Sequence, residues 1–270
     1  MPPAAALPLA VLLIAAAPAA RAGEAACWFE NGAVVVPAMV GGVAGDYILD
    51  TGTAHTVLAE TQAEGAGYAD RALRLEVVLA GQRMADRPVA VIDLDPQSFR
   101  FPTPIAGVIG ADVLSGYVVD VSFAPCRVAL YRPGHAPRFR AVASLPLATT
   151  GEVPTVIASV ADGPHTRTGL FVIATGADTA VRIDDQAALV PGAKRPGDLL
   201  TYGAARARLR ALSLGGGLWE ELRAGLVAHT DLPPDALGVV GTPVLSAWRL
   251  RFDFPRRRLS LAPARHAPPK

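Results

Sequence analysis

Two short motifs carry the side chains in this sequence that are suited to acid–base chemistry. Residues 47–58 read YILDTGTAHTVL and residues 171–182 read FVIATGADTAVR. In the first motif Asp50 directly follows an apolar run. Burial and a second carboxyl group beside it can set the protonation state of such an aspartate, as general acid or base catalysis requires. In the second motif Ala174 occupies the equivalent position. The other members of the two triplets are the same: Thr51, Gly52, Thr175 and Gly176.

A second pair of motifs shows that the triplets belong to an internal repeat. Residues 105–121 read IAGVIGADVLSGYVVDV and residues 236–252 read ALGVVGTPVLSAWRLRF. Each contains two glycines three residues apart, and we expect a short helical turn after the second glycine of each pair, Gly110 and Gly241. The chain therefore contains two similar units, each with one triplet followed by one glycine pair.

The segments around these motifs have the pattern of β-strands. Each unit starts with a β-rich run that contains proline and ends in a hairpin, with return strands at 128–131 and 259–262. The runs between are apolar or alternating, of strand length, and bounded by Gly, Pro and Asp. We expect an all-β protein with a first unit at residues 23–133, a polar connection at 134–144 and a second unit at 145–270.

The apolar-DTG and apolar-GxxG motifs together resemble the retropepsin-like family of aspartic proteases, here in a bacterial single-chain form with two lobes. The resemblance covers residues 28–261 and implies an acid-protease (pepsin/retropepsin-like) fold, with two tandem β-barrel lobes related by a pseudo-two-fold axis. In this family two aspartates share one proton and cut peptide bonds in an extended substrate. The resemblance also implies that Thr51 and Thr175 exchange hydroxyl hydrogen bonds beneath the catalytic pair.

Hairpin flaps over a substrate cleft are a further implication of the resemblance. They would lie at residues 65–74 and 197–207. Tyr68 and Tyr202 are then candidates to cover a bound peptide, and ordinary packing of a tyrosine in a turn is the alternative.

Ala174 departs from the family pattern, because a methyl group cannot titrate. One hypothesis is a pseudoenzyme that keeps the cleft for an extended peptide or protein ligand without cleaving it. A second is an active aspartic endopeptidase formed by a homodimer, in which Asp50 of each chain pairs with its counterpart. A third is slow hydrolysis by Asp50 alone.

Neither of two nearby titratable residues is expected to replace the missing carboxyl group. Asp178 stands four residues beyond Ala174, and its aligned residue in the first unit is Ala54. His55 is expected on the surface, on the strand after the first triplet.

Composition and charge exclude several other classes of function. The 270 residues carry a formal net charge of +1, and their basic residues are scattered along the chain, which argues against nucleic acid as a partner. The sequence has no phosphate-binding loop, no dinucleotide fingerprint and no nucleophile elbow, and its histidines lack metal-ligand spacing. We therefore expect no cofactor and no metal.

The N-terminus and the two cysteines indicate an exported protein. An apolar stretch at residues 4–20 ends in a small-x-small site, which predicts a signal peptide at 1–22 and a periplasmic or secreted location; an uncleaved membrane anchor is the alternative. Export permits a disulfide. In the family fold Cys27 and Cys126 lie on neighbouring segments of the first lobe, so we expect them to be bonded, with two buried thiols as the alternative.

Overall fold

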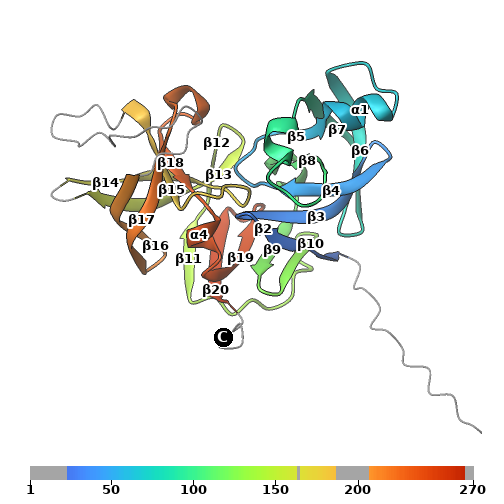
Figure 1. The fold of residues 1–270 in the computed structure, drawn as a ribbon. Coiled ribbons are helices and arrows are strands. Elements are labelled where there is room, and N and C mark those ends of the chain that lie inside the picture. The colour runs from blue at the N-terminus through green and yellow to red at the C-terminus, as the bar shows by residue number, and fades with distance from the viewer. Residues whose placement is uncertain (1–22, 163–164, 187–206, 265–270) are drawn as a thin grey trace, which may run out of the picture.

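A computed structural model describes residues 23–162, 165–186 and 207–264. The predicted signal peptide and Tyr202 lie outside these ranges. The described chain is mostly β-strand with a few short helices, and it forms two lobes side by side over a shared sheet (Figure 1). The expectation of an all-β protein with two lobes is confirmed.

The first lobe is a closed barrel of six strands with one more strand at its edge. The order around the barrel follows from pairing of each strand with the next, and β3 closes it by pairing with β6. The barrel strands are β3 (Ala33–Val40), β4 (Val43–Leu49), β8 (Ile105–Ile109), β5 (Thr56–Ala59), β7 (Gln82–Ile92) and β6 (Ala72–Leu79), and β2 (Trp28–Glu30) lies beside β3. The helices of this lobe are α1 (Glu60–Gly65), α2 (Asp95–Ser98) and α3 (Ala111–Leu114).

The second lobe repeats this order strand for strand. Its barrel closes through pairing of β13 with β16. The strands are β13 (Val153–Asp162), β14 (His165–Ile173), β18 (Ala236–Val240), β15 (Val181–Asp184), β17 (Gly217–Val227) and β16 (Ala207–Leu214), with β12 (Ala148–Thr150) beside β13. The 3-10 helix η2 (His229–Asp231) and helix α4 (Thr242–Leu245) complete it.

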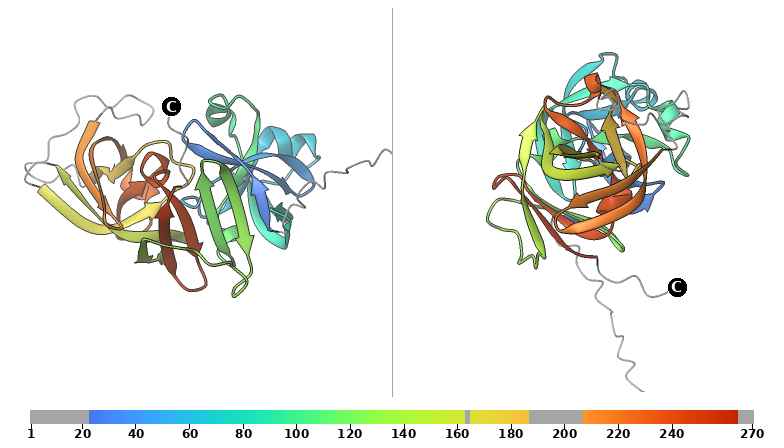
Figure 2. Two further views of the ribbon diagram at one scale, coloured as in Figure 1. Left: turned by 90° about the horizontal axis from the view of Figure 1, so that it is seen from below. Right: turned by 90° about the vertical axis from the view of Figure 1, so that its left-hand side faces the viewer.

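A central six-stranded sheet joins the lobes (Figure 2). Its order is β1 (Glu24–Ala26), β10 (Cys126–Tyr131), β9 (Val118–Phe123), β19 (Trp248–Asp253), β20 (Arg258–Pro263) and β11 (Ala143–Pro146). The first three strands come from the first unit, β19 and β20 come from the second, and β11 begins at the end of the predicted connection. Within this sheet the two units meet where β9 pairs with β19, and this pairing is called the seam.

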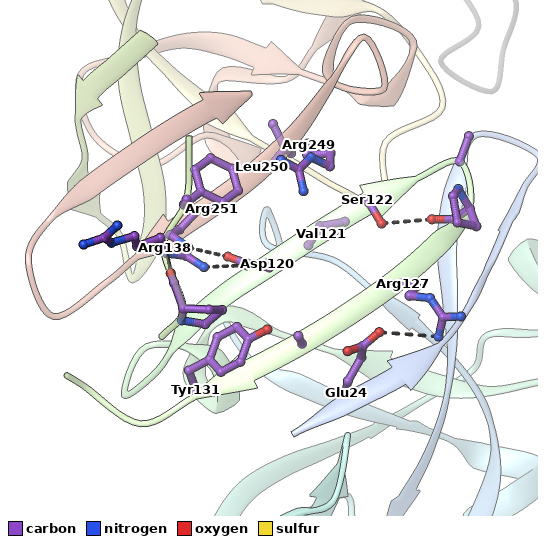
Figure 3. Close-up of a pocket in the computed structure, with 15 residues that line it drawn as sticks. Glu24, Asp120, Val121, Ser122, Arg127, Tyr131, Arg138, Arg249, Leu250 and Arg251 are labelled. Atoms are coloured by element: carbon purple, nitrogen blue, oxygen red, sulfur yellow. Dashed lines mark hydrogen bonds and ion pairs between the residues drawn. The ribbon is translucent and has the colours of Figure 1, made fainter. Parts of the chain in front are cut away.

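Side chains of the central sheet alternate between two environments. Val119, Val121 and Leu250 point into the hydrophobic core that continues into both barrels. Residues between them, such as Asp120 and Arg251, point to the opposite face, which the chain between β10 and β11 partly covers (Figure 3). This alternation follows from the two-residue period of a strand.

The first glycine of each predicted pair allows two strands to cross closely. A Cβ atom on Gly107 would lie 2.1 Å from the carbonyl oxygen of Val57, and one on Gly238 would lie 2.1 Å from that of Arg182. Any side chain there would push apart β8 and β5 in the first lobe, or β18 and β15 in the second. The repeat of glycines in the sequence thus reflects a repeated backbone contact.

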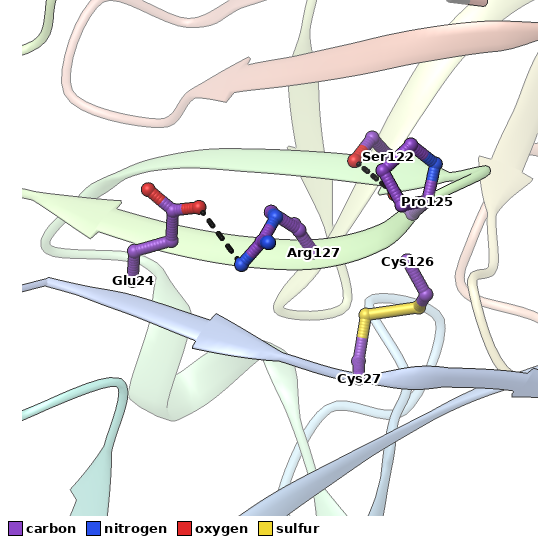
Figure 4. The surroundings of a disulfide bond; sticks show 6 residues. All are labelled: Glu24, Cys27, Ser122, Pro125, Cys126 and Arg127. Carbon is purple, nitrogen blue, oxygen red and sulfur yellow. Dashed lines mark hydrogen bonds and ion pairs between the residues drawn. A yellow bond between two sulfur atoms is a disulfide. The ribbon is translucent and has the colours of Figure 1, made fainter. Parts of the chain in front are cut away.

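A disulfide connects Cys27 with Cys126, as the sequence predicts (Figure 4). The Cα atoms are 5.0 Å apart and the bonded residues are 99 positions apart in the chain. The bond ties the chain between β1 and β2 to the start of β10, so it closes nearly the whole first unit into one loop.

Candidate active site at the lobe junction

Asp50 stands at the point where β4 leaves the first barrel. Its amide donates to the carbonyl oxygen of Ile109 at the end of β8, at 3.0 Å. In the second lobe the amide of Ala174 makes the same bond to Val240, also at 3.0 Å. The two triplets therefore leave their barrels in the same way.

Two buried threonines link the triplets across the lobe junction. The hydroxyl of Thr175 accepts from the amide of Thr51 at 3.1 Å and donates to the carbonyl of Leu49 at 2.6 Å. The hydroxyl of Thr51 accepts from the amide of Thr175 at 3.3 Å and donates to the carbonyl of Ile173. Both side chains are fully buried. Four hydrogen bonds thus fix the position of one triplet against the other.

The carboxylate of Asp50 is held by donors from both lobes. Its Oδ1 accepts from the amide of Gly52 at 2.8 Å and from the amide of Gly176, in the other lobe, at 3.1 Å. Its Oδ2 accepts from the hydroxyl of Thr53 at 3.0 Å. The group is half-buried, and these bonds fix its orientation toward the second triplet.

The second triplet approaches the first at van der Waals distance. A Cβ on Gly52 would lie 2.5 Å from the Cβ of Ala174, and a Cβ on Gly176 would lie 2.7 Å from the Cγ of Asp50. Glycine is needed at both positions because nothing larger fits. The methyl group of Ala174, 3% exposed, therefore sits where a second carboxyl group would face Asp50.

A second difference between the lobes lies three residues after Asp50 and three residues after Ala174. Thr53 bonds to Asp50 in the first lobe, whereas Ala177 stands at the same place in the second. Sequence reasoning missed Thr53, although extending the aligned triplets by one residue singles it out against Ala177. The second lobe therefore has neither the carboxyl group of Asp50 nor the hydroxyl of Thr53 that bonds to it.

The amide of Gly176 in the second triplet donates to the carboxylate of the other lobe. The amide of Gly52 donates to the carboxylate of Asp50, two residues before it. A carboxylate at position 174 would accept from the amide of Gly176 in the same way. With Ala174 present, that amide donates to Asp50 instead. One carboxylate thus uses the backbone donors of both lobes.

Asp178 and His55 each contact a charged side chain of the other lobe. Asp178 accepts from Arg100 of the first lobe at 2.6 Å, and Arg182 of its own lobe is 3.3 Å away. His55 Nε2 lies 3.3 Å from the carboxylate of Glu152 in the second lobe, and both side chains are exposed. These contacts give both residues a role in holding the lobes together.

The predicted flap residue of the first lobe lies elsewhere in the structure. The hydroxyl of Tyr68 donates to the carbonyl of Gly41 at 2.6 Å, in the turn between β3 and β4. That turn is at the opposite end of β4 from Asp50, whereas the prediction placed Tyr68 over the cleft. Residues 65–74 are the end of α1, a loop and the start of β6. Apart from Ala207, the second predicted flap lies outside the described residues.

Two searches over the described ranges bear on other kinds of site. They contain no group of three or more His, Cys, Asp or Glu side chains placed to hold a metal ion. Their helices are all too short or too polar to cross a membrane.

Comparison with known proteins identifies the fold. No known family profile matches the chain, and no curated protein matches it in sequence. The structure is similar to that of an aspartic proteinase from Irpex lacteus, with a TM-score of 0.56 over 90% of this chain and 97% of that one, at 14% sequence identity. The chain thus has the two-lobed, pepsin-like fold of aspartic proteinases.

Proposed function

We propose that this protein is an exported pseudoprotease, which binds an extended peptide or protein ligand at the lobe junction without cleaving it. The observation that carries the proposal is the methyl group of Ala174 in contact with the first triplet. The intact threonine exchange supports it as well, because the junction has kept its architecture at the position where the chemistry is missing.

The chemical argument concerns the division of labour between two carboxyl groups. In a pair that shares one proton, the ionised member deprotonates water and the protonated member donates to the carbonyl oxygen of the substrate. Asp50 can take only one of these roles at a time. Its three donors are two backbone amides and the hydroxyl of Thr53, and none of these is acidic enough to protonate a peptide carbonyl.

A homodimeric protease would pair through the surface of the first lobe that already contacts the second lobe. Pairing Asp50 of two chains would require the second lobe to leave, with loss of the Thr51–Thr175 exchange and of the seam between β9 and β19. The covalent connection between the lobes also keeps the second lobe at a high effective concentration. Intrachain pairing is therefore favoured.

Export is part of the same proposal. The disulfide between Cys27 and Cys126 requires an oxidising compartment to form and persist, which fits the predicted signal peptide and a periplasmic or secreted location.

The proposal is tested by offering the purified protein a reduced, alkylated polypeptide between about pH 3 and pH 7, the range in which carboxyl groups titrate. We expect the polypeptide to bind, measured by fluorescence anisotropy, and to keep its intact mass, measured by mass spectrometry. Cleavage that Asp50→Asn abolishes would contradict the pseudoprotease. A cleavage rate rising with the square of protein concentration would indicate the homodimer, and a linear rise would indicate hydrolysis by a single chain.

A further inference from the structure

A separate pocket lies on the outer face of the central sheet, away from the hydrophobic core of the barrels (Figure 3). Its volume is about 400 Å³, within the size range of small-molecule sites. It is lined by β9 and β10 of the first unit, by β19 of the second and by the chain between β10 and β11. The pocket exists only because the two units are joined, and the proposed function does not use it.

The charges lining this pocket do not balance. Four arginines line it and only two acidic residues do. One acid, Asp120, is fully engaged by Arg251, which holds it with two hydrogen bonds of 2.6 and 2.7 Å. The other, Glu24, lies 3.4 Å from Arg127, a looser contact at the edge of the sheet. The arginines without an acidic partner among the described residues are Arg138 and Arg249.

Strand register explains why Arg249 lacks a partner. Arg251 faces Asp120 directly across the β9–β19 seam. Two residues back along β19, the same register brings Arg249 level with Ser122, whose hydroxyl donates to the carbonyl of Pro125. On its other side Ser122 faces Arg127 of β10. A neutral serine therefore stands between two guanidinium groups, where the neighbouring row has a carboxylate.

The unpaired donor is buried. Arg249 Nε is inaccessible to solvent and has no hydrogen-bond partner among the residues that the structure describes. A buried donor on a charged group is costly to leave unsatisfied. The guanidinium group of Arg249 also lies 5.4 Å from the centre of the Phe139 ring, which restricts its orientation.

The wall of the pocket is fixed independently of any ligand. Arg251 donates to the carbonyl of Pro137 at 2.7 Å, and its guanidinium carbon lies 4.6 Å from the centre of the Phe139 ring. Arg251 is itself buried. These contacts fasten the chain between β10 and β11 over the sheet and hold the pocket open beside Arg249.

We propose that this pocket binds a small organic anion, whose carboxylate or phosphate group lies over Ser122 between Arg249 and Arg127. Guanidinium groups suit both oxyanions, because their planar donors bind two oxygens at once. The rest of the ligand occupies the remaining volume of the pocket, toward Tyr131.

Isothermal titration of the full chain with benzoate and with phenyl phosphate, in an anion-poor buffer of low ionic strength, tests the proposal. We expect saturable binding of at least one probe, and the tighter one shows whether the group recognised is planar or tetrahedral. Arg249→Gln and Arg127→Gln should each raise Kd at least about tenfold, the effect of losing a charge-assisted hydrogen bond. Arg210→Gln, on an exposed part of β16, is the matched control and should leave Kd unchanged.

Ser122→Asp provides a second test that does not remove an arginine. It places a carboxylate between Arg249 and Arg127, in line with Asp120 of the next row, which pairs with Arg251, so we expect it to abolish binding while the melting temperature is kept or raised. The proposal is overturned if neither probe binds, if neutral benzamide binds equally well, or if Arg249→Gln and Ser122→Asp bind as the Arg210→Gln control does.

Discussion

Replacing Thr175 with valine tests the threonine exchange at the lobe junction. Valine keeps the β-branched shape and has a methyl group in place of the hydroxyl. The amide of Thr51 then loses its acceptor and the carbonyl of Leu49 loses its donor, both at a fully buried position. Each unsatisfied group costs about 1 to 3 kcal/mol, so we expect the free energy of unfolding to fall by about 2 to 6 kcal/mol.

The assay is urea unfolding followed by circular dichroism, with the free energy obtained by linear extrapolation. Thr168→Val is the matched control: its hydroxyl bonds to Ser159 on an exposed part of β14, and its loss should change stability by no more than about 0.5 kcal/mol. If Thr175→Val is no more destabilising than Thr168→Val, the junction does not depend on the exchange and the reasoning fails.

Two further predictions concern stability. The double variant Cys27→Ser/Cys126→Ser should lose about 4 to 5 kcal/mol in the same urea assay, because the bond closes a loop of nearly a hundred residues; a loss below about 1 kcal/mol would contradict this. Burial raises the pKa of Tyr47, whose phenol stays neutral in the folded chain while the unfolded chain ionises above about pH 10. Stability should therefore fall as pH rises above that value, by up to about 1.4 kcal/mol per pH unit from this group. Tyr47→Phe should cost about 1 kcal/mol at pH 7, through the lost bond to Val43, and flatten the alkaline decline. Parallel stability curves for the two proteins would count against the assignment.

The sequence was sufficient to predict the fold because the repeat carries local signals. Strand-length apolar runs and paired glycines mark the same positions in both units, and the need for glycine at Gly107 and Gly238 is a backbone contact repeated with the motif. Asp50 and Ala174 could be aligned for the same reason.

Features that depend on distant side chains could not be predicted in this way. The pairing of Arg100 with Asp178 joins residues 78 positions apart, and nothing local marks either as a partner of the other. Tyr68 was placed by its position in the family pattern, yet a turn next to it in space, at Gly41, accepts its hydroxyl. The mismatch between Arg249 and Ser122 becomes visible only once β9 and β19 are in register.

The central claim is that the chain lacks a partner for Asp50, and restoring one tests it most directly. Cleavage of an unfolded polypeptide is compared for the wild type, for Asp50→Asn, for Ala174→Asp/Ala177→Thr, and for that double variant with Asp50→Asn added. Substitution at both second-lobe positions supplies the carboxyl group and its orienting hydroxyl. We predict no cleavage by the wild type, acid-dependent cleavage by the restored pair, and loss of that activity with Asp50→Asn. Wild-type cleavage as fast as that of the restored pair, and abolished by Asp50→Asn alone, would contradict the account.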